Sequence, residues 1–217
     1  MFRFSILALT LLSFNAFAQN WEINKDHSEV IFKVPYLGVS EISGRFSKFS
    51  GLLTVNEENK IQDILVKIDV ASIETGNKMR DGHLKGSEFF RSRDFPHIIF
   101  KSTSVKEIKP SEYEAIGELT VKDVTKPFTI NFTASETVKD TWGYDNKFIK
   151  FSSKINRQDF NIKWNKTLDN DKYLVGDEVS FGGVFQTQPI RLKTPSSKYM
   201  IPDNKHMRDR EKEQRKK

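Results

Sequence analysis

The chain has 217 residues, no cysteine and a formal net charge of +6 at pH 7. Without cysteine it cannot form disulfides, thiolate metal sites or covalent haem links, so its stability must come from a hydrophobic core, and its length allows one domain or two very small ones. Arg3 contributes one positive charge and residues 203–217 contribute a net three, so residues 19–202 carry a net charge of +2. These residues lack the clustered positive charge that a nucleic-acid-binding groove needs.

Residues 1–18 have the pattern of a secretory signal peptide. Arg3 precedes an apolar run from Phe4 to Leu12, and the segment ends in Ala16-Phe17-Ala18, with small residues where signal peptidase cuts. The run is shorter than the ~20 apolar residues of a membrane span, and no later segment is long or apolar enough to cross a bilayer. We expect cleavage after Ala18 and a soluble, exported mature protein, which has no cysteine to carry a lipid.

Beyond the signal segment, apolar and polar residues alternate with a period of two, which is typical of strands with one apolar face. Turn signals such as Lys109-Pro110-Ser111 separate the runs, and no linker or repeat divides them. About eight to ten antiparallel strands in one domain from about 20 to 195 indicate an all-β sandwich or a closed barrel. The predicted strands lie at 28–34, 41–47, 50–56, 63–70, 97–106, 112–122, 127–134, 147–155 and 178–187.

The stretch RDGHLKGSEFF, residues 80–90, differs from these runs. Met79 and His83 lie four residues apart, and Leu84, Phe89 and Phe90 follow, so a helix here would have one apolar and one charged face. We therefore predict one short helical segment near 77–90 that lies on an apolar surface.

The inward strand faces combine large and small residues. Phenylalanines with small neighbours could surround an elongated cavity for an apolar guest, or each small residue could receive a large one opposite and fill the interior. Alternation alone leaves both readings open and favours the filled one. The residues concerned are Phe32, Phe100, Phe128, Phe132, Phe151, Phe181 and Phe185, with Ser102, Ala115, Gly117, Ala134, Ser153 and Gly183 between them.

The sequence offers little support for catalysis. The residues Gly38 to Ile42 fail the GxSxG pattern at its last position, and no phosphate-binding glycine loop is present. The histidines, which are His27, His83, His97 and His206, form no HxH or HExxH motif. The acids Asp169, Asp171, Asp177 and Glu178 lack the glycine of a calcium loop, so we interpret them as solvated. We predict no enzyme activity, no catalytic residue, no metal and no cofactor.

Several motifs, in this order and spacing, are familiar as a set. They are DHSEVIFKV (26–34), LGVSEISGRFSKFSG (37–51), RDGHLKGSEFFRSRDFPHIIFKST (80–103), GELTVKDVTKPFTINF (117–132), NRQDFNIKW (156–164) and VGDEV (175–179). Through them, nearly the whole mature length resembles the YceI-like family of polyisoprenoid-binding, lipocalin-like proteins.

The resemblance implies an extended antiparallel β-barrel of about eight strands, in a bacterial periplasm, whose apolar lumen binds a long-chain amphiphile. It also implies that the segment near 77–90 is placed against the barrel. The residues that match the family signature there are Arg80, Asp81, His83, Leu84, Phe89 and Phe90.

Two departures from the family pattern stand out. Tyr36, after Pro35, replaces a histidine of many members, so any polar contact of that histidine is in question. The last strand reads SFGGVFQTQP, and its two glycines suggest a bulge or different packing.

The inward phases and the resemblance together give a set of candidate ligand contacts. These are Phe32, Val34, Tyr36, Met79, His83, Leu84, Phe90, Phe100, Phe128, Ile130, Phe132, Phe151 and Phe181.

The leading hypothesis is non-enzymatic binding, carriage or sequestration of a polyisoprenoid or fatty-acyl amphiphile. The alternative is a periplasmic structural or interaction protein with a filled barrel that acts through its surface. We expect a signal peptide at 1–18, a lipid-binding domain at 19–195 and a charged, disordered tail at 196–217. Transient contact with membrane lipid and a homodimer stay open, and no nucleic-acid partner is expected.

Overall fold

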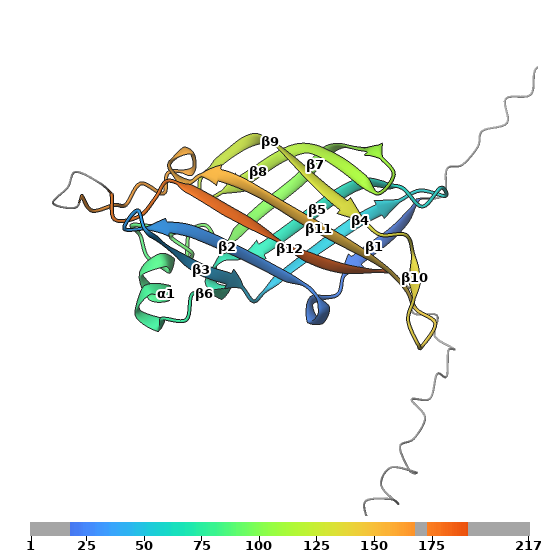
Figure 1. Cartoon of the computed structure of the whole chain (residues 1–217), viewed down its shortest axis with the longest axis horizontal. Coiled ribbons are helices and arrows are strands. Elements are labelled where there is room, and N and C mark those ends of the chain that lie inside the picture. Colours follow the sequence, from blue (N-terminus) through green and yellow to red (C-terminus); the bar gives the residue numbers. More distant parts are fainter. Residues whose placement is uncertain (1–17, 168–172, 191–217) are drawn as a thin grey trace, which may run out of the picture.

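The computed structural model describes residues 18–167 and 173–190, which form one long barrel with a helix at one end (Figure 1). The predicted signal peptide, apart from Ala18, and the predicted tail at 196–217 lie outside the described residues. None of the described helices has the length and apolar character that crossing a membrane requires. The strands are β1 (Gln19–Ile23), β2 (Glu29–Tyr36), β3 (Ser40–Phe46), β4 (Phe49–Val55), β5 (Ile61–Asp69), β6 (Ile73–Glu74), β7 (His97–Lys109), β8 (Glu112–Val121), β9 (Val124–Ala134), β10 (Val138–Lys139), β11 (Asp145–Asn156) and β12 (Glu178–Pro189). The helices are η1 (Lys25–His27), η2 (Val70–Ser72), α1 (Lys78–Lys85) and η3 (Arg157–Phe160).

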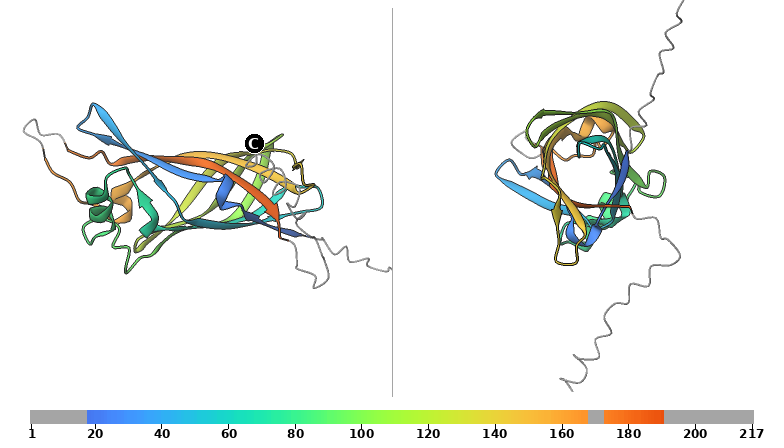
Figure 2. Two further views of the ribbon diagram at one scale, coloured as in Figure 1. Left: turned by 90° about the horizontal axis from the view of Figure 1, so that it is seen from below. Right: turned by 90° about the vertical axis from the view of Figure 1, so that its right-hand side faces the viewer.

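Closed antiparallel pairing confirms the predicted barrel of about eight strands. β1 and β2 are two halves of one bent strand, as are β3 and β4, and β5 and β6. Counted this way, eight consecutive strands pair with their neighbours around the barrel, and the last strand, β12, closes it by pairing with β1 and β2 of the first. The view along the barrel shows the closed ring (Figure 2). β10 adds a short hairpin to the start of β11.

Ser72 in η2 ties the bends of two neighbouring strands together. Its hydroxyl accepts a hydrogen bond from the Lys48 amide at 3.0 Å and donates one to the Asp69 carbonyl at 2.6 Å. The Ser47 amide donates to the Ser72 carbonyl at 3.2 Å. Backbone groups that lose their ladder partners at the bend therefore keep hydrogen bonds.

β12 closes the barrel. It pairs with β11 from Glu178 to Thr187, and on its other side it pairs first with β2 and then with β1. The predicted bulge in this strand is wrong, because the ladder runs without a register shift through Gly182 and Gly183. A Cβ at Gly183 would lie 2.0 Å from the Glu29 carbonyl oxygen. The glycines allow close approach of the neighbouring strands rather than an irregular strand.

Helix α1 is shorter than the predicted segment. The Asn77 side chain caps its start by accepting from the amides of Met79 and Arg80, and the helix ends at Gly86, whose backbone is extended. The Phe90 amide then bonds the Leu84 carbonyl at 3.1 Å in a turn. Phe89 and Phe90 therefore reach the barrel through a turn and not on a helix face.

The barrel interior is filled at one end and hollow over the rest. Along β9, Phe132 and Ala134 are buried by protein, whereas Phe128 and Ile130 keep partial exposure although they point inward. Phe132 stacks on Tyr113 with ring centroids 5.1 Å apart. The filled end lies away from α1 and contains Trp21, Val55, Ile61, Tyr113, Phe132, Ala134, Ile149 and Phe185.

The small inward residues serve the filled end and the strand contacts instead of enlarging the hollow part. Ser102, Ala115 and Ala134 are buried. A Cβ on Gly117 would meet the Lys101 carbonyl oxygen at 2.3 Å, so this glycine marks close strand contact. The hollow part therefore arises from how large side chains are distributed along the barrel.

We expect Gly183→Ala to lower the free energy of unfolding by about 1–3 kcal/mol, because a Cβ there requires β2 and β12 to move apart. Gly82→Ala in α1 is the matched control, since a Cβ at Gly82 meets nothing within 4 Å. The control should leave stability unchanged or raise it by up to ~1 kcal/mol through helix propensity. Urea unfolding measures both, and equal stability of the two variants would contradict the close-approach role of Gly183.

Candidate functional site

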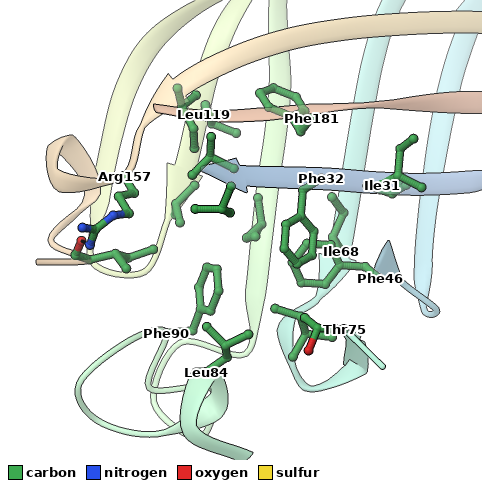
Figure 3. Close-up of a pocket in the computed structure, with 18 of the residues that line it drawn as sticks. Ile31, Phe32, Phe46, Ile68, Thr75, Leu84, Phe90, Leu119, Arg157 and Phe181 are labelled. Atoms are coloured by element: carbon green, nitrogen blue, oxygen red, sulfur yellow. Dashed lines mark hydrogen bonds between the residues drawn. The ribbon is translucent and has the colours of Figure 1, made fainter. Parts of the chain in front are cut away.

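An apolar cavity of about 780 Å³ occupies the hollow part of the barrel. Its size falls within the range of small-molecule sites, and its walls are almost entirely aliphatic and aromatic. In Figure 3, Phe32 and Ile68 lie on one wall, Leu119 and Phe181 on another, and Phe90 and Leu84 reach in from the α1 segment. Such walls suit an apolar guest and offer few polar groups for chemistry.

All the residues predicted as ligand contacts line this cavity, although their contact with a ligand stays a prediction. The alternation of each strand brings them together because inward residues of neighbouring strands share one interior. They are Phe32, Val34, Tyr36, Met79, His83, Leu84, Phe90, Phe100, Phe128, Ile130, Phe132, Phe151 and Phe181.

The cavity opens beside α1. β3 pairs with β6 only at Arg45 and Phe46, so the part of β3 from Ser40 to Gly44 has no strand partner on that side among the described residues. Asn77 and Met79 are exposed and also line the cavity, which places its mouth between α1 and the β2–β3 hairpin.

Arg80 and Asp81 fasten α1 to the end of β6. The Thr75 amide and hydroxyl donate to Asp81 Oδ1 at 2.9 and 2.6 Å. Arg80 donates through Nε to the Thr75 hydroxyl and through Nη2 to the Thr75 carbonyl, both at 2.7 Å. Two of the signature residues therefore position the helix at the mouth.

His83 belongs to an aromatic cluster at the same end. Its ring meets Phe89 and Trp164 edge-on, with centroids 4.9 and 5.2 Å away. Its Nε2 lies 2.7 Å from Glu88 Oε2. No group of three or more potential metal ligands occurs among the described residues. These contacts give His83 a packing role in the wall of the cavity.

Arg157 is a functional residue that the sequence interpretation missed. Only 4% of its surface is exposed, and it lies on the cavity wall. Its guanidinium donates to the carbonyls of Ile162, Trp164 and Gly176 at 2.7 to 3.0 Å and to Asp177 Oδ1 at 2.8 Å. Burial lowers the pKa of Arg157, while the Asp177 carboxylate opposes that shift.

The interpretation of Asp177 as solvated is therefore wrong. Its carboxylate is the charge partner of a buried guanidinium, and a buried cation needs such a partner and full hydrogen bonding. Asp169 and Asp171 lie outside the described residues, and Glu178 pairs with Lys154 at the surface. The NRQDFNIKW motif held the arginine, but its partners come from segments that folding brings together.

A YceI-like domain model matches residues 21–185. The chain belongs to the YceI-like domain family. Protein YceI of Escherichia coli O157:H7 is 35% identical over 167 residues, which cover 73% of this chain and 87% of that protein. A UPF0312 protein of Photorhabdus laumondii is also 35% identical, over 72% of this chain and 82% of its own length.

Solved structures share the YceI-like barrel. BcnA of Burkholderia cenocepacia superposes with a TM-score of 0.65 at 23% identity and covers 76% of this chain and 98% of its own. A polyisoprenoid-binding domain from Saccharophagus degradans gives a TM-score of 0.59 at 13% identity, over 78% of this chain and 98% of its own. At these identities the likeness concerns the fold.

Tyr36 is the position at which the sequence resemblance leads us to expect a histidine. It forms an isolated bridge with Val175 and lines the cavity near its mouth. The replacement therefore brings a phenol ring to the entrance of the cavity.

We expect Arg157→Met to lower the free energy of unfolding by about 3–5 kcal/mol, because Asp177 and three carbonyls lose their partner in a buried site. Lys154→Met is the matched control, since the Lys154–Glu178 pair is exposed and should leave the unfolding midpoint unchanged. Chemical unfolding of both variants provides the measurement. A midpoint for Arg157→Met equal to that of the control would contradict the anchoring role.

Proposed function

We propose that this YceI-like protein binds a long-chain amphiphile of polyisoprenoid or fatty-acyl type in its barrel and carries or sequesters it without chemical change. The observation that carries the proposal is the apolar cavity that enters at α1 and ends against packed aromatic residues. The structural neighbour from Saccharophagus degradans, a polyisoprenoid-binding domain, agrees with this ligand class.

The size and the apolar wall of the cavity suit a long apolar chain. A water molecule occupies about 30 Å³ of liquid and a methylene group is of similar size, so 780 Å³ has room for on the order of 25 carbons. Each buried methylene contributes about 0.8 kcal/mol. Affinity should therefore rise with chain length until the chain meets Phe132 and its neighbours. The hollow interior argues against the alternative of a filled barrel that acts through its surface.

We propose that the protein acts in the periplasm. Residues 1–18 would direct export and be removed before Gln19, residues 19–195 would form the lipid-binding domain, and residues 196–217 would be a charged tail. An N-terminus at Gln19 in the exported protein, read by peptide sequencing, is the expected result. An intact N-terminus in the membrane fraction would contradict it.

The function is tested by native mass spectrometry of the protein purified without detergent. We expect adducts whose masses, after organic extraction, correspond to isoprenoid or acyl chains. Protein that is free of adducts, and that takes up neither a C16 fatty acid nor farnesol in titrations, would overturn the proposal.

We expect Ile130→Trp to reduce lipid occupancy at least severalfold, because the larger ring enters the cavity in the middle of β9. The empty protein should change in stability by less than about 1.5 kcal/mol, since the ring enters open space. Thr129→Trp, on the outward face of the same strand, is the matched control and should keep full occupancy. Equal lipid content in the two variants, measured by extraction and mass spectrometry, would place the lipid outside the cavity.

A further inference from the structure

Exposed apolar side chains gather around the mouth of the cavity. Val39 at the tip of the β2–β3 hairpin is 89% exposed, and Met79 in α1 is 86% exposed. Leu37 and Tyr173 are also exposed. Exposing apolar side chains to water does not stabilise a protein. Their position beside the opening therefore needs a functional explanation.

Backbone hydrogen bonds join the segments that carry Leu37 and Tyr173. The Leu37 amide donates to the Leu174 carbonyl at 2.9 Å, and the Leu174 amide donates to the Lys166 carbonyl at 2.8 Å. Met79 and Leu174 both line the cavity. The hairpin tip and α1 lie at the same end of the barrel in both side views (Figure 1, Figure 2). We call Leu37, Val39, Met79 and Tyr173 the mouth rim.

The described segments of the rim also carry positive charge. Lys78, Lys163 and Lys166 are exposed and belong to the segments that form the mouth. The nearby acids Glu41 and Glu88 already have partners, in Lys33 at 3.8 Å and His83 at 2.7 Å. Lysines around exposed apolar side chains are the combination that binds anionic lipid surfaces, since the ammonium groups meet headgroups while the apolar groups enter the boundary layer.

We propose that the mouth rim is a membrane-docking surface that places Val39 and Met79 in the headgroup–acyl boundary of an anionic bilayer, with the cavity opening toward the acyl chains. A guest would then pass between bilayer and barrel without crossing water. This purpose rests on the proposed lipid binding, whereas docking itself can be measured without any ligand.

The opposite end of the barrel provides a built-in comparison. Trp142, in the turn between β10 and β11, is 81% exposed and as apolar as the rim residues. The main cavity lining includes no residue of this turn, and the charges beside it, Lys139 and Asp145, pair with each other. If any exposed apolar side chain were enough for vesicle binding, this end would bind vesicles as well as the mouth rim does.

The absence of cysteine allows one labelled position at a time. Val39→Cys, Met79→Cys and Trp142→Cys, each carrying an environment-sensitive NBD fluorophore, are mixed with vesicles of equal parts phosphatidylglycerol and phosphatidylcholine. We expect blue-shifted, brighter emission at positions 39 and 79, no change at 142, and a weaker response with pure phosphatidylcholine or in 0.5 M salt. A response confined to position 142, or none at 39 and 79, would overturn the proposal.

A second measurement uses unlabelled protein. Val39→Asp combined with Met79→Asp should weaken partition into the anionic vesicles about tenfold, whereas Trp142→Asp should leave it unchanged. All variants share the same chain ends, so any binding by residues 1–18 or 191–217 is common to them. Unchanged partition of the double variant would overturn the docking surface. A shift at 39 and 79 in a protein that yields no bound lipid would refute the proposed function while the docking surface stands.

Discussion

The structure depends on one strand, β12, which has strand partners on both sides and closes the barrel. On one side it pairs with β11. On the other side it pairs with β2 and then with β1, which are the two halves of one bent strand. The contact is close enough that a side chain at Gly183 would collide with the carbonyl of Glu29. Closure leaves few free edges and encloses an interior between the strands.

How the interior is filled determines whether the barrel has room for a ligand. Tyr113, stacked on Phe132, and the buried Ala134 and Phe185 belong to a packed end. Further along, large inward side chains line a cavity instead of filling the interior. The two readings of the sequence, a filled barrel and a hollow one, are therefore each correct for part of the length. The filled end supports the fold, and the hollow part is free to hold a guest.

The mouth is stabilised by polar groups whose hydrogen bonds are made to the protein itself. Arg157 donates to backbone carbonyls and to Asp177, Arg80 donates to Thr75, and Asp81 accepts from Thr75. A buried arginine with all its partners in place holds segments that have no ladder of their own. The cavity wall therefore stays mostly apolar while hydrogen bonds hold the segments of the entrance in place.

The sequence by itself determined the strands, because a two-residue period puts one apolar face on each of them whatever their partners are. That same phase identified the inward positions such as Phe32, Ile130 and Phe151, all on the cavity wall. It could not determine that Gly86 would end α1 early, since local helix propensity and the docking of Phe89 compete there.

Only the tertiary structure decided where the barrel is filled, because that depends on which side chains of different strands face each other at the same height. It alone revealed Arg157, whose partners lie up to twenty residues away along the chain and are mostly carbonyl groups, which every residue has. A pattern of side chains cannot signal a contact made to the backbone.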